Sequence, residues 1–169
     1  MSTSKRPDAL AEPGLDPLDS RAARVAALDA LARRDLATEA LRGKLLDKGY
    51  DPIVVGGVID RLRDEKLVDD RRYVENFIGF HAARGHGPLR IRADLKKMGL
   101  DGELVEDGVK SYGDWIDPLQ KARQKKFGAA LPADYAARQR QARFLNYRGF
   151  TGAQIRMALG FDTDIDVDT

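Results

Sequence analysis

The stretch PLRIRADLKKM, residues 88–98, contains four cations whose spacing suits the binding of anions. Successive helical residues are about 100° apart, so Ile91, Leu95 and Met98 would share one face. The cations would flank that face on both sides: Arg90, Arg92, Lys96 and Lys97. Because arginine can bind a carboxylate or phosphate through two hydrogen bonds, this helix is a candidate surface for phosphates or acidic side chains. A solvated, amphipathic helix without a partner is the alternative.

A second group of cations lies in the last third of the chain. Residues 114–161 contain nine Lys or Arg residues and three acidic residues, whereas residues 162–169 contain four aspartates. Such a basic surface indicates nucleic acid or an acidic protein as the partner, although a salt-paired, solvated surface would look the same. With Arg84 beside a Gly-rich turn, the further candidate contacts are Arg84, Arg123, Lys125, Lys126, Arg138, Arg140, Arg143, Arg148 and Arg156.

Other reactive side chains give no support for catalysis. The only histidines, His81 and His86, span the end of a helix, and we expect them to be solvated polar residues rather than metal ligands. The turn at 85–87 lacks the third glycine and the preceding strand of a dinucleotide-binding loop. Asp69 and Asp70 are better interpreted as helix caps than as acid–base partners. Since the chain also has no cysteine, we expect no enzyme activity, no cofactor and no metal.

Aromatic residues could stack on nucleic-acid bases, but their spacing favours another role. Tyr73, Phe77 and Phe80 recur at helical spacing, which predicts packing in a core. Tyr112 and Trp115 are ambiguous on spacing alone.

The elements that must position these side chains are predicted by a phrase that recurs every fifty residues. Gly49, Gly99 and Gly149 are each followed by an apolar residue and then by Asp or Thr. A glycine can adopt the left-handed conformation that ends one helix, and the Asp or Thr side chain can accept hydrogen bonds from the amides that begin the next. Each phrase therefore predicts a helix, a tight turn and another helix.

Apolar spacing and turn residues extend this pattern to three helices per unit. The predicted helices span 18–34, 38–48 and 52–65, then 69–84, 88–98 and 102–113, and finally 115–128, 133–148 and 152–160. The expected organisation is a disordered leader (1–17), three repeats (18–66, 67–113 and 114–161) and a disordered acidic tail (162–169). Apolar residues keep register between repeats, as at Leu45, Leu95 and Leu145.

The fold class is therefore all-α, with three tandem three-helix repeats. Each repeat has only a small core, so neighbours are expected to cover one another and form an elongated array that could be curved. No apolar run approaches the roughly 20 residues of a membrane helix, and prolines and charges replace the apolar segment of a signal peptide. We expect a cytoplasmic monomer with no membrane partner.

Four consecutive blocks of the sequence resemble the RecX family, bacterial regulators of the RecA recombinase. They read LARRDLATEALRGKLLDKGY, VIDRLRDEKLVDDRRYVENFI, GHGPLRIRADLKKMGL and RFLNYRGFTGAQIRMAL, and the match covers roughly residues 22–159. The resemblance implies three tandem three-helix units and a non-enzymatic protein that lies in the groove of the RecA filament on DNA. It also implies modulation, mostly inhibition, of strand exchange, ATP hydrolysis and repressor cleavage by RecA.

Two other functions remain open at this point: a general nucleic-acid-binding module without a recombinase partner, and a helical scaffold for another acidic protein. A sequence-specific transcription factor is disfavoured, because the helix at 102–113 would bring Glu103, Glu106 and Asp107 towards phosphates. Single- or double-stranded DNA could contribute to binding through the basic helices. Filament capping, filament destabilisation and groove blocking are not distinguished by the sequence.

Overall fold

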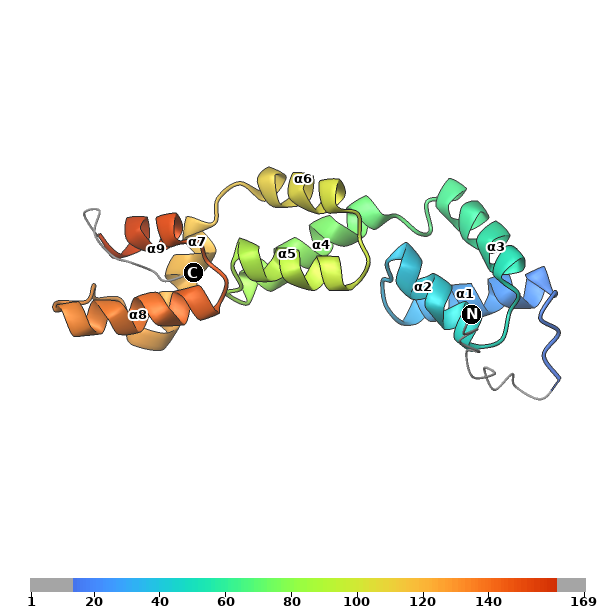
Figure 1. Ribbon diagram of the computed structural model, residues 1–169, viewed down its shortest axis with the longest axis horizontal. Helices are drawn as coiled ribbons and strands as arrows, with labels where there is room; N and C mark the ends of the chain where they lie inside the picture. The colour runs from blue at the N-terminus through green and yellow to red at the C-terminus, as the bar shows by residue number, and fades with distance from the viewer. Residues whose placement is uncertain (1–13, 161–169) are drawn as a thin grey trace, which may run out of the picture. The chain divides into compact units, whose positions relative to one another are not determined.

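The computed structural model describes residues 14–160, and every regular element within that range is a helix (Figure 1). The helices are α1 (Ser20–Arg33), α2 (Thr38–Asp47), α3 (Pro52–Asp64), α4 (Asp70–Ala83), α5 (Pro88–Lys97), α6 (Gly102–Tyr112), α7 (Ile116–Phe127), α8 (Tyr135–Tyr147) and α9 (Gly152–Leu159). Each bound lies within two residues of its prediction, and the all-α class is confirmed. The chain divides into two compact units, residues 1–73 and 74–169.

The ends of the chain compare only in part with the predicted leader and tail. Residues 1–13 of the leader and all of the acidic tail, 162–169, lie outside the described residues. Residues 14–17 belong to the fold, because Leu15 packs against the core of the first unit and the Pro17 carbonyl accepts a hydrogen bond from the Asp51 amide at 3.0 Å. Between residues 14 and 160, no helix is long and apolar enough to cross a membrane.

The first unit has a core built from α1, α2 and α3. Alanine at positions 23 and 27 gives α1 a fully buried face without bulk, so the larger side chains of α2 and α3 can pack against it. These larger core residues include Leu41, Leu45, Val55, Ile59 and Leu62.

Asp69 and Asp70 are helix caps, as the sequence predicts. Asp69 accepts a hydrogen bond from the Arg72 amide at 3.1 Å in the first turn of α4. That amide is the main reason why the pKa of the Asp69 carboxyl is lowered. Asp70 accepts from the Thr38 amide at 2.8 Å, so it caps α2, whose own N-cap residue, Ala37, has no side-chain acceptor.

The three predicted corners share one backbone geometry. Gly49, Gly99 and Gly149 have φ angles of 102°, 78° and 89°, in the left-handed region that favours glycine. The residue after each glycine donates its amide to the leucine carbonyl five positions earlier, with N···O distances of 3.2, 3.4 and 3.1 Å in chain order. The next residue caps the following helix through its side chain: Asp51, Asp101 and Thr151. These local interactions explain why the same phrase builds the same turn.

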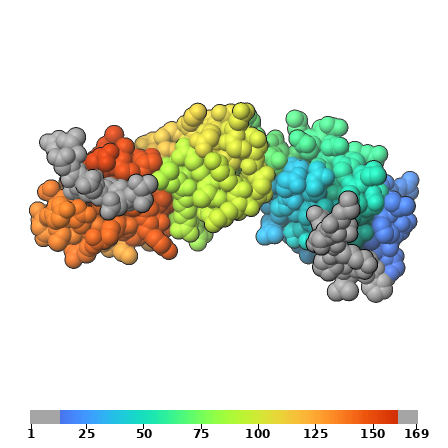
Figure 2. All heavy atoms as spheres, in the orientation of Figure 1, coloured from blue at the N-terminus to red at the C-terminus, as the bar shows by residue number. Residues whose placement is uncertain are grey.

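The second unit contains α4 from Val74 onward and α5 to α9, and it joins the second and third repeats backbone to backbone. The Gly87 amide donates to the Arg148 carbonyl at 2.8 Å, and the Leu89 amide donates to the Gly149 carbonyl at 2.9 Å. A Cβ atom at Gly87 would overlap the Gly149 carbonyl and the Phe150 amide nitrogen, so the approach requires glycine. The turn between α4 and α5 therefore docks on the corner between α8 and α9, and Figure 2 shows these segments in contact.

Two aromatic residues of the second unit differ in their environment. Trp115 is buried, and its Nε1 donates to the Val109 carbonyl at 3.3 Å. Phe80, in contrast, has 58% of its surface exposed, so the prediction that it packs in the core is wrong. The helical spacing correctly placed Phe80 on the same helix as Phe77 but did not determine how much of that face is covered.

Candidate interaction surface

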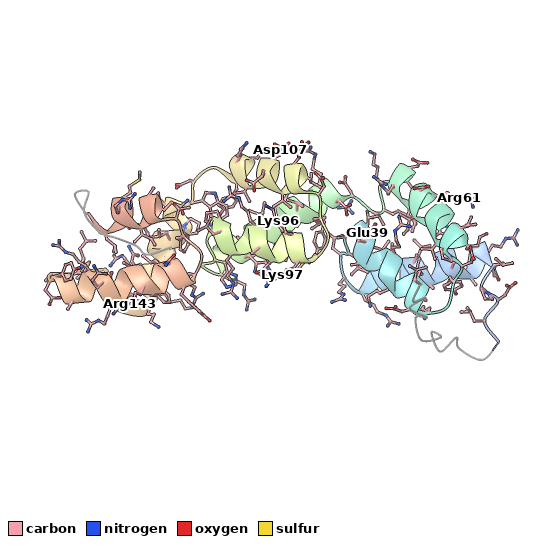
Figure 3. All side chains as sticks on the ribbon, viewed as in Figure 1. Glu39, Arg61, Lys96, Lys97, Asp107 and Arg143 are labelled. Carbon is pink, nitrogen blue, oxygen red and sulfur yellow. The ribbon has the colours of Figure 1, made fainter. Side chains whose placement is uncertain are left out.

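The four candidate cations of α5 have different environments. Arg92 forms an ion pair with Glu106 of α6 through Nε at 2.9 Å, and Lys96 lies 3.9 Å from the same carboxylate. Arg90 lies 3.8 Å from Asp94, one turn along its own helix. Lys97 is exposed and has no ion pair within residues 14–160. In Figure 3, Lys96 and Lys97 extend from α5. Arg92 thus helps to hold α5 against α6, whereas Lys97 is available for an external anion.

A cluster of cations and aromatic rings lies where the second and third repeats meet. Arg148 donates through Nη1 to the Arg84 carbonyl at 3.2 Å, and its guanidinium lies 5.1 Å from the centre of the Phe144 ring. Lys126 lies 4.7 Å from the same ring, and Arg84 lies 5.0 Å from the Phe80 ring. We call these five residues the junction cluster. Cation–π contacts of this kind hold the charges in place, and the side chains of Arg84 and Lys126 are exposed.

The two histidines lie beside the junction cluster. Their Nδ1 atoms are 3.0 Å apart, and His81 stacks on Phe77 with ring centres 4.0 Å apart. Burial is the main cause that lowers the pKa of both imidazoles, and Arg90 lowers the pKa of each as well. The prediction that they are solvated polar residues holds in part, since each residue is half-buried. Among the described residues, no group of three or more His, Cys, Asp or Glu side chains could hold a metal ion.

Arg123 must be removed from the candidate contacts, because only 1% of its surface is exposed. Its guanidinium donates to the carbonyls of Ala129 and Ala130 at 3.0 and 2.9 Å, and it lies 3.5 Å from Oε1 of Gln141. These carbonyls belong to the irregular segment between α7 and α8. The residue therefore fixes that segment and does not present its charge to a partner.

The remaining cations lie on α7, α8 and α9. Lys125, Arg140 and Arg143 are exposed, and Figure 3 shows Arg143 extending from α8. Arg138 is half-buried, with its Nε 3.5 Å from the Pro132 carbonyl, and Arg156 is half-buried on α9.

The second unit therefore presents two kinds of candidate cation. Those with exposed side chains are Arg84, Lys96, Lys97, Lys125, Lys126, Arg140 and Arg143. The half-buried ones are Arg90, Arg92, Arg138, Arg148 and Arg156. Exposed guanidinium and ammonium groups can bind phosphate or carboxylate oxygens, and the aromatic rings of the junction cluster add apolar contact area. Sequence spacing missed this cluster, because Phe80, Lys126 and Phe144 come from three different helices.

The repeats match the models of one protein family. The first, second and third three-helix domains of RecX match residues 23–62, 69–109 and 117–159. The chain is 41% identical over 130 residues to a regulatory protein RecX from Pseudomonas savastanoi pv. phaseolicola, covering 76% of this chain and 84% of that protein. It is 41% identical over 140 residues to a regulatory protein RecX from Halorhodospira halophila, covering 82% and 87%.

A solved structure has the same fold at lower identity. The crystal structure of RecX from Lactobacillus salivarius superimposes with a TM-score of 0.73 and 21% identity, over 84% of this chain and 95% of that one. A second structure, described as regulatory protein RecX, gives a TM-score of 0.67 and 18% identity. Three consecutive family domains, together with relatives of about 40% identity over most of the chain, establish that this chain belongs to the RecX family.

Proposed function

We propose that this protein binds the RecA nucleoprotein filament and mostly inhibits the recombinase, ATPase and coprotease activities of RecA during DNA repair. Membership of a family of regulatory proteins supports a binding role without catalysis. The observation that carries the proposal is the set of exposed cations on α5, α7 and α8, with the junction cluster between them. A filament of RecA on DNA offers both carboxylates and phosphates to such a surface.

The contact is proposed to form through cations that have no structural task. Lys97, Arg140 and Arg143 are exposed and have no ion pair within residues 14–160, so binding an anion would break nothing in the fold. Arg92 would have to give up Glu106 first, which makes it a poorer contact. The protein acts as a monomer, and DNA contributes phosphates to a surface that mainly binds RecA.

The primary experiment measures ATP hydrolysis by RecA on single-stranded DNA, with and without this protein. We expect the wild-type chain to reduce hydrolysis and the double variant Arg140→Glu/Arg143→Glu to lose most of that effect. A matched control reverses two exposed arginines of α3, Arg61→Glu/Arg63→Glu, and should inhibit as the wild type does. Unchanged hydrolysis with the wild-type chain would refute the proposal, and equal effects of both double variants would refute α8 as the contact.

A general nucleic-acid-binding module is the second candidate, and the junction cluster favours it because the exposed Phe80 ring beside Arg84 can stack on a base. Co-sedimentation separates the two functions. Retention on RecA filaments well above retention on bare DNA supports the regulator. Equal retention on both supports the general module.

A further inference from the structure

One face of α8 combines arginines with an exposed tyrosine. We call it the α8 stripe, and its residues are spaced by four, three and four positions: Ala136, Arg140, Arg143 and Tyr147. At about 100° per residue, these positions lie within an arc of roughly 60°. All four residues are exposed, and Tyr147 has 79% of its surface exposed. In Figure 3, Arg143 extends from α8 into the solvent.

The stripe lies opposite the face that holds α8 in the fold. The buried residues of α8 are Gln141, Ala142 and Leu145, and their mean direction is about 180° from that of the stripe. Packing of that face fixes the helix while the stripe points away from the core. The 13 residues of α8 include no acid, and neither arginine of the stripe has an ion pair within residues 14–160. No carboxylate of the helix therefore competes with an external anion.

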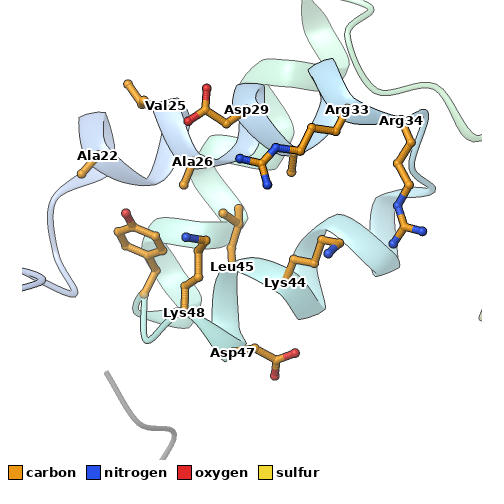
Figure 4. A pocket seen from close by; sticks show the side chains of 12 residues that line it. Ala22, Val25, Ala26, Asp29, Arg33, Arg34, Lys44, Leu45, Asp47 and Lys48 are labelled. Carbon is orange, nitrogen blue, oxygen red and sulfur yellow. The ribbon is translucent and has the colours of Figure 1, made fainter. Parts of the chain in front are cut away.

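The second helices of the other two repeats lack this combination. Counting from the leucine that keeps the helices in register, α2 has Ala40, Gly43 and Asp47 at the positions of the arginines and the tyrosine. Figure 4 shows Asp47 on α2, where this helix and α1 line an open groove of about 660 Å³. An aspartate in that place repels phosphates. In α5 the same positions hold two cations but no ring: Arg90, Ala93 and Lys97.

We propose that the α8 stripe binds single-stranded DNA, with phosphates on Arg140 and Arg143 and one base stacked on the ring of Tyr147. Proteins that bind single strands combine cations along the backbone with aromatic rings on which unpaired bases lie. The stripe offers both within about 11 Å, because Arg140 and Tyr147 are seven residues apart at 1.5 Å per residue. A protein carboxylate can bind the arginines but has no flat surface for the ring. The bases of a duplex are already stacked on one another, so the ring favours a single strand.

This inference deepens the proposed function and rests on it only for the source of the strand, which is the DNA of the RecA filament. It divides the proposed surface between two partners: α8 contacts DNA, and the cations of α5 are left for acidic side chains of RecA. The two ideas fail separately. A chain that inhibits ATP hydrolysis by RecA without any preference for bases contradicts only this inference, and a chain that prefers bases without inhibiting RecA contradicts only the proposed function.

The test measures binding of the full chain to two labelled strands of equal length by fluorescence anisotropy: oligothymidylate, and an abasic strand that has the same phosphates without bases. We expect the wild-type chain to bind oligothymidylate about tenfold more tightly, which is within the range for stacking one base on an aromatic side chain. Tyr147→Ala should lose this preference and bind the abasic strand as the wild type does. Tyr147→Phe should keep the preference, because it keeps the ring. Arg140→Glu/Arg143→Glu should weaken binding to both strands by a similar factor.

The matched control is Tyr135→Ala on the same helix. Tyr135 has 70% of its surface exposed but lies about 120° around the helix from Tyr147, so its loss should change neither affinity. The inference is overturned if the wild-type chain binds the two strands equally, or if Tyr147→Ala retains the preference for bases. It is also overturned if Tyr135→Ala loses the preference as Tyr147→Ala does, or if Tyr147→Phe behaves like Tyr147→Ala.

Discussion

Replacing Gly87 with alanine tests whether the second and third repeats are held together by their backbones. Gly87 has an ordinary φ of −86°, so the substitution adds no backbone strain and acts only through its Cβ atom. That atom would overlap the Gly149 carbonyl and the Phe150 amide. The turn must then move away and lose the hydrogen bonds that Gly87 and Leu89 donate at 2.8 and 2.9 Å.

The expected loss of stability follows from these contacts. Each backbone hydrogen bond contributes about 1 kcal/mol net, and overpacking costs about 1–3 kcal/mol, so Gly87→Ala should lower the free energy of unfolding by about 3–5 kcal/mol. The matched control is Gly79→Ala in α4, where a Cβ atom would meet nothing within 4 Å. This control should raise the stability by up to about 1 kcal/mol, because alanine favours a helix interior over glycine.

Urea denaturation followed by circular dichroism measures both variants, and amide hydrogen exchange locates the change. We expect the Gly87 and Leu89 amides to lose protection in Gly87→Ala while the amides of α9 beyond the corner keep part of theirs. If Gly87→Ala and Gly79→Ala differ by less than about 1 kcal/mol, the junction carries little of the stability of the second unit and the reasoning fails.

Three further predictions concern charged groups. Arg123→Leu should destabilise the chain by about 2 kcal/mol, because the hydrogen bonds to the carbonyls of Ala129 and Ala130 are lost. The control Arg140→Leu, at an exposed site, should change the stability by less than about 0.5 kcal/mol, so similar midpoints of urea denaturation for the two variants would contradict the prediction. Burial lowers the pKa of His81 and His86 in the folded chain, so the unfolded chain binds protons more readily and stability should fall as the pH drops below about 6.5. In thermal melts at several pH values, His86→Gln should weaken that fall, and a pH-independent melting temperature would contradict the prediction. If the exposed cations contact phosphates, the affinity for single-stranded DNA should fall by about 0.7 log units per log unit of salt for each phosphate bound. The double variant Arg140→Glu/Arg143→Glu should then reduce the slope of log affinity against log salt by more than one, and an unchanged slope would place the phosphate contacts elsewhere.

The corners were predictable from sequence because each depends on neighbours in the chain. Gly149, Phe150 and Thr151 contribute the left-handed turn, the buried side chain and the helix cap within three positions. The helix bounds follow for the same reason, since caps and turn residues mark them locally. Register between repeats then required only that the phrase recur at a fixed spacing.

The environments of Arg123 and Gly87 could not be predicted in the same way. Arg123 resembles its neighbours Lys125 and Lys126 in sequence, and its burial depends on carbonyls of a segment that follows the end of the helix. Gly87 belongs to a turn whose sequence suggested only that it lacks the glycines of a nucleotide-binding loop. Its actual contact, Gly149, lies 62 residues away, and no local pattern indicates such an approach.

These differences among the cations determine how the proposed surface should be probed. A reversal that includes Arg92 would break the ion pair with Glu106 between α5 and α6, and one that includes Arg148 would remove its hydrogen bond to the Arg84 carbonyl. Either change could abolish binding by disturbing the fold, because the partner group left behind loses its charge pair or donor. Loss of binding is informative only for side chains such as Lys97 and Arg143, whose charge meets no acid within residues 14–160. The proposed interaction surface is therefore best tested through the cations that the fold itself does not use.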